Sequence, residues 1–183
     1  MARKDPYREL LSGNIFMAFM GTLTTPLATA ATSAVAFDIP HAWIRVPSGT
    51  AIIPLYAKVT VEAAGATTQG EIIVISTSND VGDGTSSAAA GGPLNTNTGS
   101  SATSLCTARQ LASVAVTTPT GVREMERFSF AASAVNGSFI HNRASTRPLD
   151  IIRGPGTWMI NIGGNAVSYY AQMYWAEYLE ADL

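Results

Sequence analysis

The sequence predicts an all-β protein, an antiparallel β-sandwich that is jelly-roll-like and carries an extended N-terminal arm. Three observations indicate this fold. Two runs rich in aromatic and β-branched residues flank a Gly-Gly-Asn turn near the C-terminus. About eight strand-like segments follow one another with turn residues between them, and no helical spacing of apolar residues occurs after residue 40. The length of 183 residues fits one domain. We expect residues 1–40 to form the arm and residues 41–183 the sandwich.

The first 40 residues start with basic side chains and continue into an apolar stretch, as a secretory signal also does. Asp5 and Glu9 lie in the part that should be purely basic, and no apolar run reaches the 18 residues of a membrane-spanning helix. We favour an arm, because apolar side chains outside an alternating strand must pack on some surface. The arm residues that we expect to contact a neighbouring subunit are Tyr7, Leu10, Ile15, Phe16 and Phe19.

Three strand-like segments open the sandwich. Residues 42–46 end at a Pro-Ser-Gly turn. Residues 55–62 alternate between apolar and polar side chains, and Pro54 before them marks a strand start, a bulge or an edge because proline has no N–H to donate. Residues 71–77 are mostly β-branched, which predicts a strand that is buried on both faces.

Residues 78–104 show neither helical nor strand periodicity, so we expect one long loop, held by a neighbouring subunit. Asn79, Asp80 and Asp83 loosely resemble a calcium-binding loop. The closing glutamate is missing and the spacing is wrong, so we favour a turn with solvated acids.

The remaining segments complete the strand count. Residues 105–116 and 128–134 are strand-like, and the Asn136-Gly137 pair predicts a hairpin turn before a strand at residues 138–140. A short strand is expected at residues 149–152.

The two closing runs, residues 158–162 and 167–179, are predicted to form a hairpin through the turn at residues 163–165. Counting by two along the longer run gives one apolar face and one polar-aromatic face. The apolar face holds Val167, Tyr169, Ala171, Met173, Trp175 and Leu179, and the other holds Ser168, Gln172, Tyr174 and Tyr178.

Composition excludes several classes of protein. Charged residues make up only 13% of the chain, about half the usual share. The net charge is −2 and the basic residues are scattered, so no nucleic-acid footprint is present. The single cysteine, Cys106, cannot form an intrachain disulfide, and we expect it to be a small buried hydrophobe.

No motif names a reaction. His41 and His141 lack an adjacent acid or a metal-spaced partner, and we expect a structural role for His41 at a strand start. Asp150 is expected to form a surface ion pair with Arg147 and Arg153 rather than to join a triad. We therefore expect no enzyme, no metal and no cofactor.

The C-terminal aromatic residues leave two interpretations open. They can form a flat surface that stacks on sugars, or they can divide between the core and a subunit interface, where tyrosine and tryptophan are enriched. We favour the second, with Tyr170, Tyr174 and Tyr178 at the interface.

Residues 43–55, the loop at 78–87 and the ending Tyr174-Trp-Ala-Glu-Tyr resemble tailed-phage virion proteins. More narrowly, the chain is similar to small β-sandwich proteins that bind the outside of a phage head as cement or decoration subunits. The resemblance implies a homotrimer bound between major capsid subunits on the virion exterior, without catalysis and without direct contact to nucleic acid or membrane. Two alternatives remain: a carbohydrate- or receptor-binding module, and a single-jelly-roll shell protein.

Overall fold

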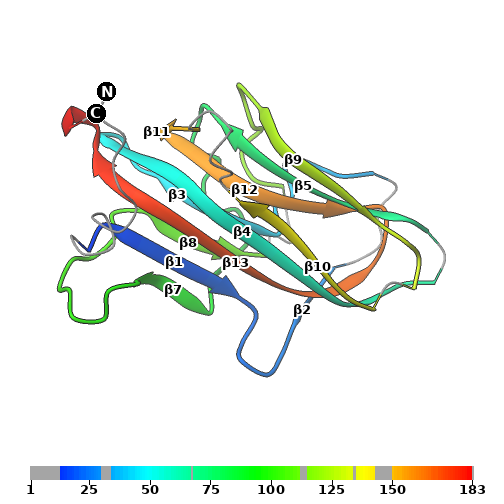
Figure 1. The fold of residues 1–183 in the computed structure, drawn as a ribbon. Helices are drawn as coiled ribbons and strands as arrows, with labels where there is room; N and C mark the ends of the chain where they lie inside the picture. The colour runs from blue at the N-terminus through cyan, green and yellow to red at the C-terminus, as the bar shows by residue number, and fades with distance from the viewer. Residues whose placement is uncertain are drawn as a thin grey trace.

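The computed structural model describes residues 13–29, 34–66, 68–111, 115–133, 135–142 and 150–182. They form two antiparallel sheets that pack together as a β-sandwich, as Figure 1 shows. The predicted fold class is therefore confirmed. The jelly-roll-like arrangement and the arm as a whole stay predictions.

The seven-stranded sheet has the order β10-β4-β13-β1-β7, with β11 paired to β4 and β2 paired to β13. Its strands are β10 (Val135–Asn142), β4 (Thr50–Ala64), β13 (Val167–Leu179), β1 (Ile15–Met20), β7 (Gly91–Asn95), β11 (Ile152–Arg153) and β2 (Leu27–Ala28). The six-stranded sheet has the order β6-β8-β3-β12-β5-β9. Its strands are β6 (Ser87–Ala88), β8 (Thr107–Gln110), β3 (Ala42–Val46), β12 (Gly156–Gly163), β5 (Gly70–Thr77) and β9 (Arg123–Phe130). A short 3-10 turn, η1 (Glu180–Asp182), follows β13.

Strands β4 and β13 pair along their whole length, from Val167 opposite Ala64 to Leu179 opposite Thr50. The register shifts where Tyr174 lies opposite Tyr56 and Trp175 lies opposite Pro54, so the proline sits at a bulge, one of the three places that its missing N–H predicts. The predicted apolar face of β13 is buried from Val167 to Trp175, but Leu179 is 55% exposed at the strand end.

The predicted closing hairpin is wrong. Strand β12 pairs with β3 and β5, whereas β13 lies in the other sheet, so the turn at residues 163–165 carries the chain between the two layers. All eight residues of β12 are buried, and such a strand needs a partner on both edges. Asn165 fixes the crossing, because its side-chain amide donates to the carbonyls of Gly65 at 2.9 Å and Thr68 at 2.7 Å.

Residues 15–20, which we expected in the arm, form an interior strand of the seven-stranded sheet. Strand β1 lies between β13 and β7, and its side chains Phe16, Ala18 and Met20 are buried in the core between the sheets. A strand of six residues with three small or apolar inward positions satisfies both its backbone and its apolar side chains inside its own domain. For these residues the arm expectation is wrong. Tyr7 and Leu10 lie outside the described residues.

Two further sequence predictions are corrected. The segment 78–104 is not strand-free, because it contains β6 and β7, and β7 pairs with β1. Asn136-Gly137 is not a turn but lies within β10, where Gly137 is opposite Val61 of β4. The chain turns before β10 instead, and Ser133 there has a φ of 58°. The pairing of β10 with β4 outweighs the local preference of Asn-Gly for a turn.

His41 precedes β3 and is buried, with a structural role as predicted. Its Nδ1 accepts a hydrogen bond from the Ile162 amide at 3.0 Å, and its carbonyl accepts one from the Tyr169 hydroxyl at 3.0 Å. Burial lowers the pKa of His41 from 6.5 to about 4. Cys106 is also buried, as expected.

Within the part of the chain that the structure describes, no helix has the length and apolar character needed to span a bilayer.

A buried neutral histidine makes stability fall in acid. Because the folded pKa of His41 lies below its unfolded value, its contribution is complete above about pH 6.5 and is lost as the pH falls toward 4. A shift of this size corresponds to about 3 kcal/mol. We expect wild type to lose about that much more unfolding free energy than His41→Asn between pH 7 and pH 4, measured by urea denaturation. Equal losses in the two proteins would contradict the assignment.

Because β1 is a strand of the core, we expect two truncations to differ in whether the protein folds. Deleting residues 1–12 leaves every described strand in place, so we expect a folded all-β protein. Deleting residues 1–20 removes buried Phe16 and Met20, worth about 1.5–3 kcal/mol each, and exposes an edge of β13, so we expect an unfolded or insoluble protein. Circular dichroism distinguishes the cases. A folded 21–183 fragment would show that β1 is dispensable to the core.

Candidate docking surface on the seven-stranded sheet

The face of the seven-stranded sheet that points away from the six-stranded sheet carries an ordered array of side chains. The strand registers place them in three rows across the sheet. The rows are Leu94, Met17, Tyr174, Tyr56 and Asn142; then Gly91, Phe19, Gln172, Lys58 and Ile140; then Tyr170, Thr60 and Ser138. We call these thirteen residues the docking face. Lys58 is its single charged residue, and the exposed Glu62 of β4 borders it beside Tyr170.

Aromatic rings on the docking face rest on glycines. An added Cβ at Gly91 would overlap the ring of Phe19, and one at Gly21 would lie 2.8 Å from Cδ1 of Tyr170. Gly21 also has a φ of 86°, which favours glycine. Because these two positions are glycine, the rings of Phe19 and Tyr170 lie against the sheet rather than extending into solvent.

The centre of the docking face is a tyrosine pair. The rings of Tyr56 and Tyr174 are 5.7 Å apart with an interplanar angle of 80°, an edge-to-face arrangement. Their side chains are half-buried, as are those of Met17 and Tyr170, so each keeps apolar surface that a partner can cover.

One end of this face is closed by the chain itself. Ile15 and Tyr178 are buried there with Ile53 and Ala176 in a small cluster. Phe16 points into the main core, 6.2 Å from the ring of Trp175. Of the residues expected at an interface, Ile15, Phe16 and Tyr178 are buried within the chain, whereas Phe19, Tyr170 and Tyr174 lie on the docking face.

The other residues of the face were missed by sequence reasoning. The arm prediction for residues 15–20 leaves Met17 off any strand face, although these residues alternate between inward and outward positions. Tyr56 and Lys58 belong to the segment 55–62, whose alternation between apolar and polar side chains was the available signal. Leu94 and Ile140 are 48% and 43% exposed, and nothing in their local sequence marks them.

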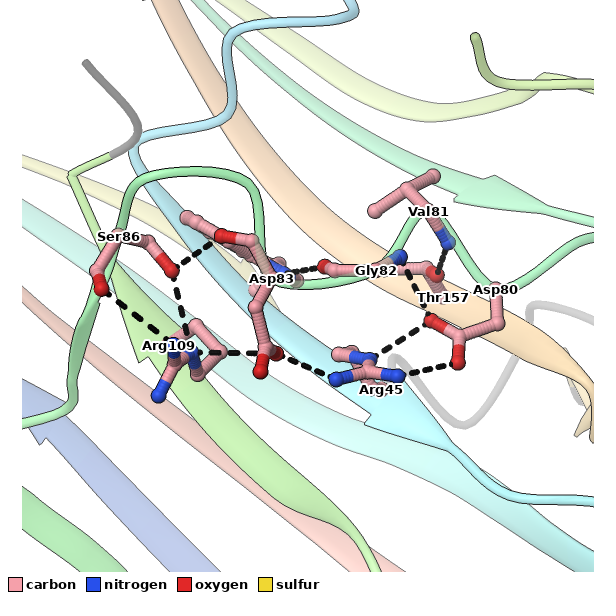
Figure 2. A network of polar contacts seen from close by, with 9 residues as sticks. Arg45, Asp80, Val81, Gly82, Asp83, Ser86, Arg109 and Thr157 are labelled. Atoms are coloured by element: carbon pink, nitrogen blue, oxygen red, sulfur yellow. Dashed lines mark hydrogen bonds and ion pairs between the residues drawn. The ribbon is translucent and has the colours of Figure 1, made fainter. Parts of the chain in front are cut away.

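A second feature, on the six-stranded sheet, fixes the loop that follows β5 (Figure 2). Arg45 of β3 donates two hydrogen bonds to the carboxylate of Asp80, at 2.7 and 2.6 Å, and a further one to Asp83. Arg109 of β8 lies 3.2 Å from the same Asp83 carboxylate and donates to the Ser86 hydroxyl at 3.1 Å. Two arginines from neighbouring strands thus clamp two acids from one loop.

We expected Asp80 and Asp83 to be solvated, but both carboxylates accept hydrogen bonds from Arg45. The hydrogen bonds from Arg45 hold the pKa of Asp80 below its ordinary value of 3.8. The hydrogen bonds to Asp80 in turn raise the pKa of Arg45, so both groups stay charged. The carboxylates point at guanidinium groups, which repel a cation, and within the described ranges no group of three His, Cys, Asp or Glu side chains is arranged to hold a metal ion.

The later part of the 78–104 segment is held by Glu177 of β13. Its buried carboxylate accepts hydrogen bonds from the Ser104 hydroxyl and the Leu105 amide, both at 2.6 Å, and from the Trp175 indole at 3.2 Å. The contacts described for this segment come from its own chain, and the expected contact with a neighbouring subunit stays a prediction.

The groups considered for catalysis lie in separate places. His141 is buried with its Nδ1 3.7 Å from Glu126, whereas Asp150 lies 3.4 Å from Arg123. Arg153 pairs with Glu180 at 3.0 Å rather than with Asp150, and Arg147 is outside the described residues. A cleft of about 520 Å³ lies between the end of β5 and residues 151–155. It contains Arg123 and Arg153 but neither histidine.

The chain was compared with protein-family models, with curated proteins and with solved structures, and none of them matches it.

The arginine clamp predicts a local effect on the loop. Arg45→Met removes three charge-assisted hydrogen bonds from a side chain that is only 26% exposed, and we expect a loss of about 2 kcal/mol in unfolding free energy. Hydrogen exchange at the Val81 and Gly82 amides should also accelerate. The matched control is Arg127→Met on the exposed edge of β9, where we expect a much smaller change. Unaltered exchange in Arg45→Met would refute the clamp.

Proposed function

We propose that the protein is a non-catalytic structural subunit of a phage virion, which binds the outside of the head as a cement or decoration protein. The observation that carries the proposal is the docking face: twelve uncharged residues and one lysine, arranged across five strands, with aromatic rings seated on glycines. Depletion of charge together with enrichment in Tyr, Phe and Met is the composition of the centre of a protein–protein interface.

The shape of the face supports a protein partner. It lies on a sheet of paired strands, so its side chains keep fixed positions when a partner binds and little ordering cost opposes binding. The resemblance to phage head proteins implies that the partner is the outer surface of the major capsid protein. Low net charge fits a contact that depends on apolar packing rather than on electrostatic steering.

A carbohydrate-binding module is the second candidate, and the aromatic content of the face is what favours it. The tyrosine pair argues against it, because rings at 80° to each other do not form a coplanar platform for a sugar ring. A glycan array with a clear hit that Tyr174→Ser abolishes, together with no affinity for heads, would replace our proposal with this one.

Binding to heads tests the proposal. Tyr174 is at the centre of the face, and we expect Tyr174→Ser to weaken binding to heads of the phage that carries this gene by about tenfold or more. Val122→Ser is the control. Val122 is an apolar residue that is 40% exposed, but it precedes β9 of the other sheet. Co-sedimentation with heads that lack the protein measures both. Equal effects of the two substitutions, or none from Tyr174→Ser, would count against the docking face.

A further inference from the structure

The four outermost strands of the two sheets differ in how they are protected against pairing with another chain. An outermost strand presents backbone N–H and C=O groups, and proteins guard such edges with short length, proline, charge or a bulge. In the six-stranded sheet, β6 is only two residues long and β9 carries four charged residues among its eight. In the seven-stranded sheet, β7 contains Pro93 and meets β1 with a register shift.

Strand β10 has none of these protections. It is eight residues long, with the sequence Val-Asn-Gly-Ser-Phe-Ile-His-Asn, and contains no proline, lysine, arginine, aspartate or glutamate. It pairs with β4 without a register shift, and it ends the order of the sheet, so the described residues place a strand on one side of it only. Figure 1 shows β10 along the margin of its sheet. Its outward side chain Ile140 is 43% exposed.

We propose that β10 is a strand-pairing site, and that its partner is β10 of a second copy of this chain, joined antiparallel about a two-fold axis. In such a pair the residues near the axis lie close to their own counterparts, so charged side chains there would repel each other, whereas β10 contains no Asp, Glu, Lys or Arg. The strands also match in length.

The pleat restricts the register. Residues directly opposite one another must point to the same face of the joined sheet, so the two residue numbers of every pair sum to an even number. A pair centred on Phe139 sets Ser138 opposite the second copy's Ile140. The two Ile140 side chains then lie diagonally across the axis, a distance that long side chains span, and each covers the exposed apolar surface of the other.

The consequence concerns the docking face. A two-fold axis perpendicular to the joined sheet keeps the docking faces of both copies on the same side. Ile140 and Ser138 belong to the end of each face, so the two faces become one continuous surface. A dimer then presents twice the contact area to a partner, and the second contact forms at a high effective concentration. The joined sheet is two-fold rather than three-fold, which differs from the trimer that the resemblance implies.

Substitution on the two edges tests the pairing. Ile140→Lys places two lysines diagonally across the axis and removes the apolar contact between the two Ile140 side chains, so we expect the dimer dissociation constant to rise at least about tenfold. Ser129→Lys is the matched control, because Ser129 is an exposed residue of the other eight-residue outermost strand, β9. Sedimentation equilibrium gives the masses, and far-UV circular dichroism checks that both variants fold as wild type does.

Cross-linking tests the register. In a Ser138→Cys/Ile140→Cys variant, the thiol introduced at position 138 of each copy faces the thiol introduced at position 140 of the other, within the reach of a disulfide. Residues i and i+2 of one strand are too far apart to form one. Oxidised glutathione should yield a covalent dimer from this variant and little from either single variant. Native Cys106 is buried and does not compete.

A dimer that Ile140→Lys dissociates and Ser129→Lys leaves intact, together with the covalent dimer, supports the proposal. A monomeric or trimeric wild type overturns it, as does a dimer that Ile140→Lys leaves unchanged or that fails to cross-link. A monomer whose β10 amides become protected from exchange only on phage heads would assign the edge to a segment of another protein. Head binding is a separate measurement, so failure of the pairing and failure of the proposed function are distinguishable.

Discussion

The pairing of β4 with β13 is the interaction on which the rest of the sandwich depends. It runs from Val167 opposite Ala64 to Leu179 opposite Thr50 and forms the centre of the seven-stranded sheet. The outer edge of β13 receives β1, and the outer edge of β4 receives β10 and β11. Because side chains alternate along each strand, this one register decides which residues enter the core and which form the docking face. The bulge at Pro54 marks where the docking face ends and the small cluster around Tyr178 begins.

The long strands leave long connections, and buried polar groups hold these in place. The clamp of Arg45 on Asp80 and the buried carboxylate of Glu177 secure different parts of the segment 78–104. Each pairs a charged group with several hydrogen-bond partners, which a partly buried charge requires. These charged groups hold loops, whereas Lys58 is the single charged residue among the thirteen of the docking face.

The sequence predicted the fold class, the strands at residues 42–46 and 71–77, and the alternation of β13, because these depend on local periodicity. The sequence predictions were wrong where strand pairing with residues far along the chain decides whether a segment forms a turn or a strand. The turn at residues 163–165 has hairpin chemistry, yet it joins different sheets, because β12 and β13 each have other strands on both edges. Asn136-Gly137 has turn chemistry, yet β4 holds it in a strand. For the docking face, alternation identified Tyr174, and the enrichment of tyrosine at interfaces identified Tyr170. Met17 joined them only when β1 paired with β13, a contact that links residues more than 150 positions apart.

The central claim is that the docking face is covered by a protein partner, and hydroxyl-radical footprinting tests it most directly. Met17, Tyr56, Tyr170 and Tyr174 are all partly exposed in the single chain and carry side chains that radicals oxidise readily. The isolated protein and the protein bound to phage heads are oxidised under the same dose, and the modified residues are counted by mass spectrometry. Our account predicts that these four side chains lose most of their oxidation on heads, whereas exposed Leu105 and Val122 keep theirs. Equal oxidation of the four in both samples would contradict it.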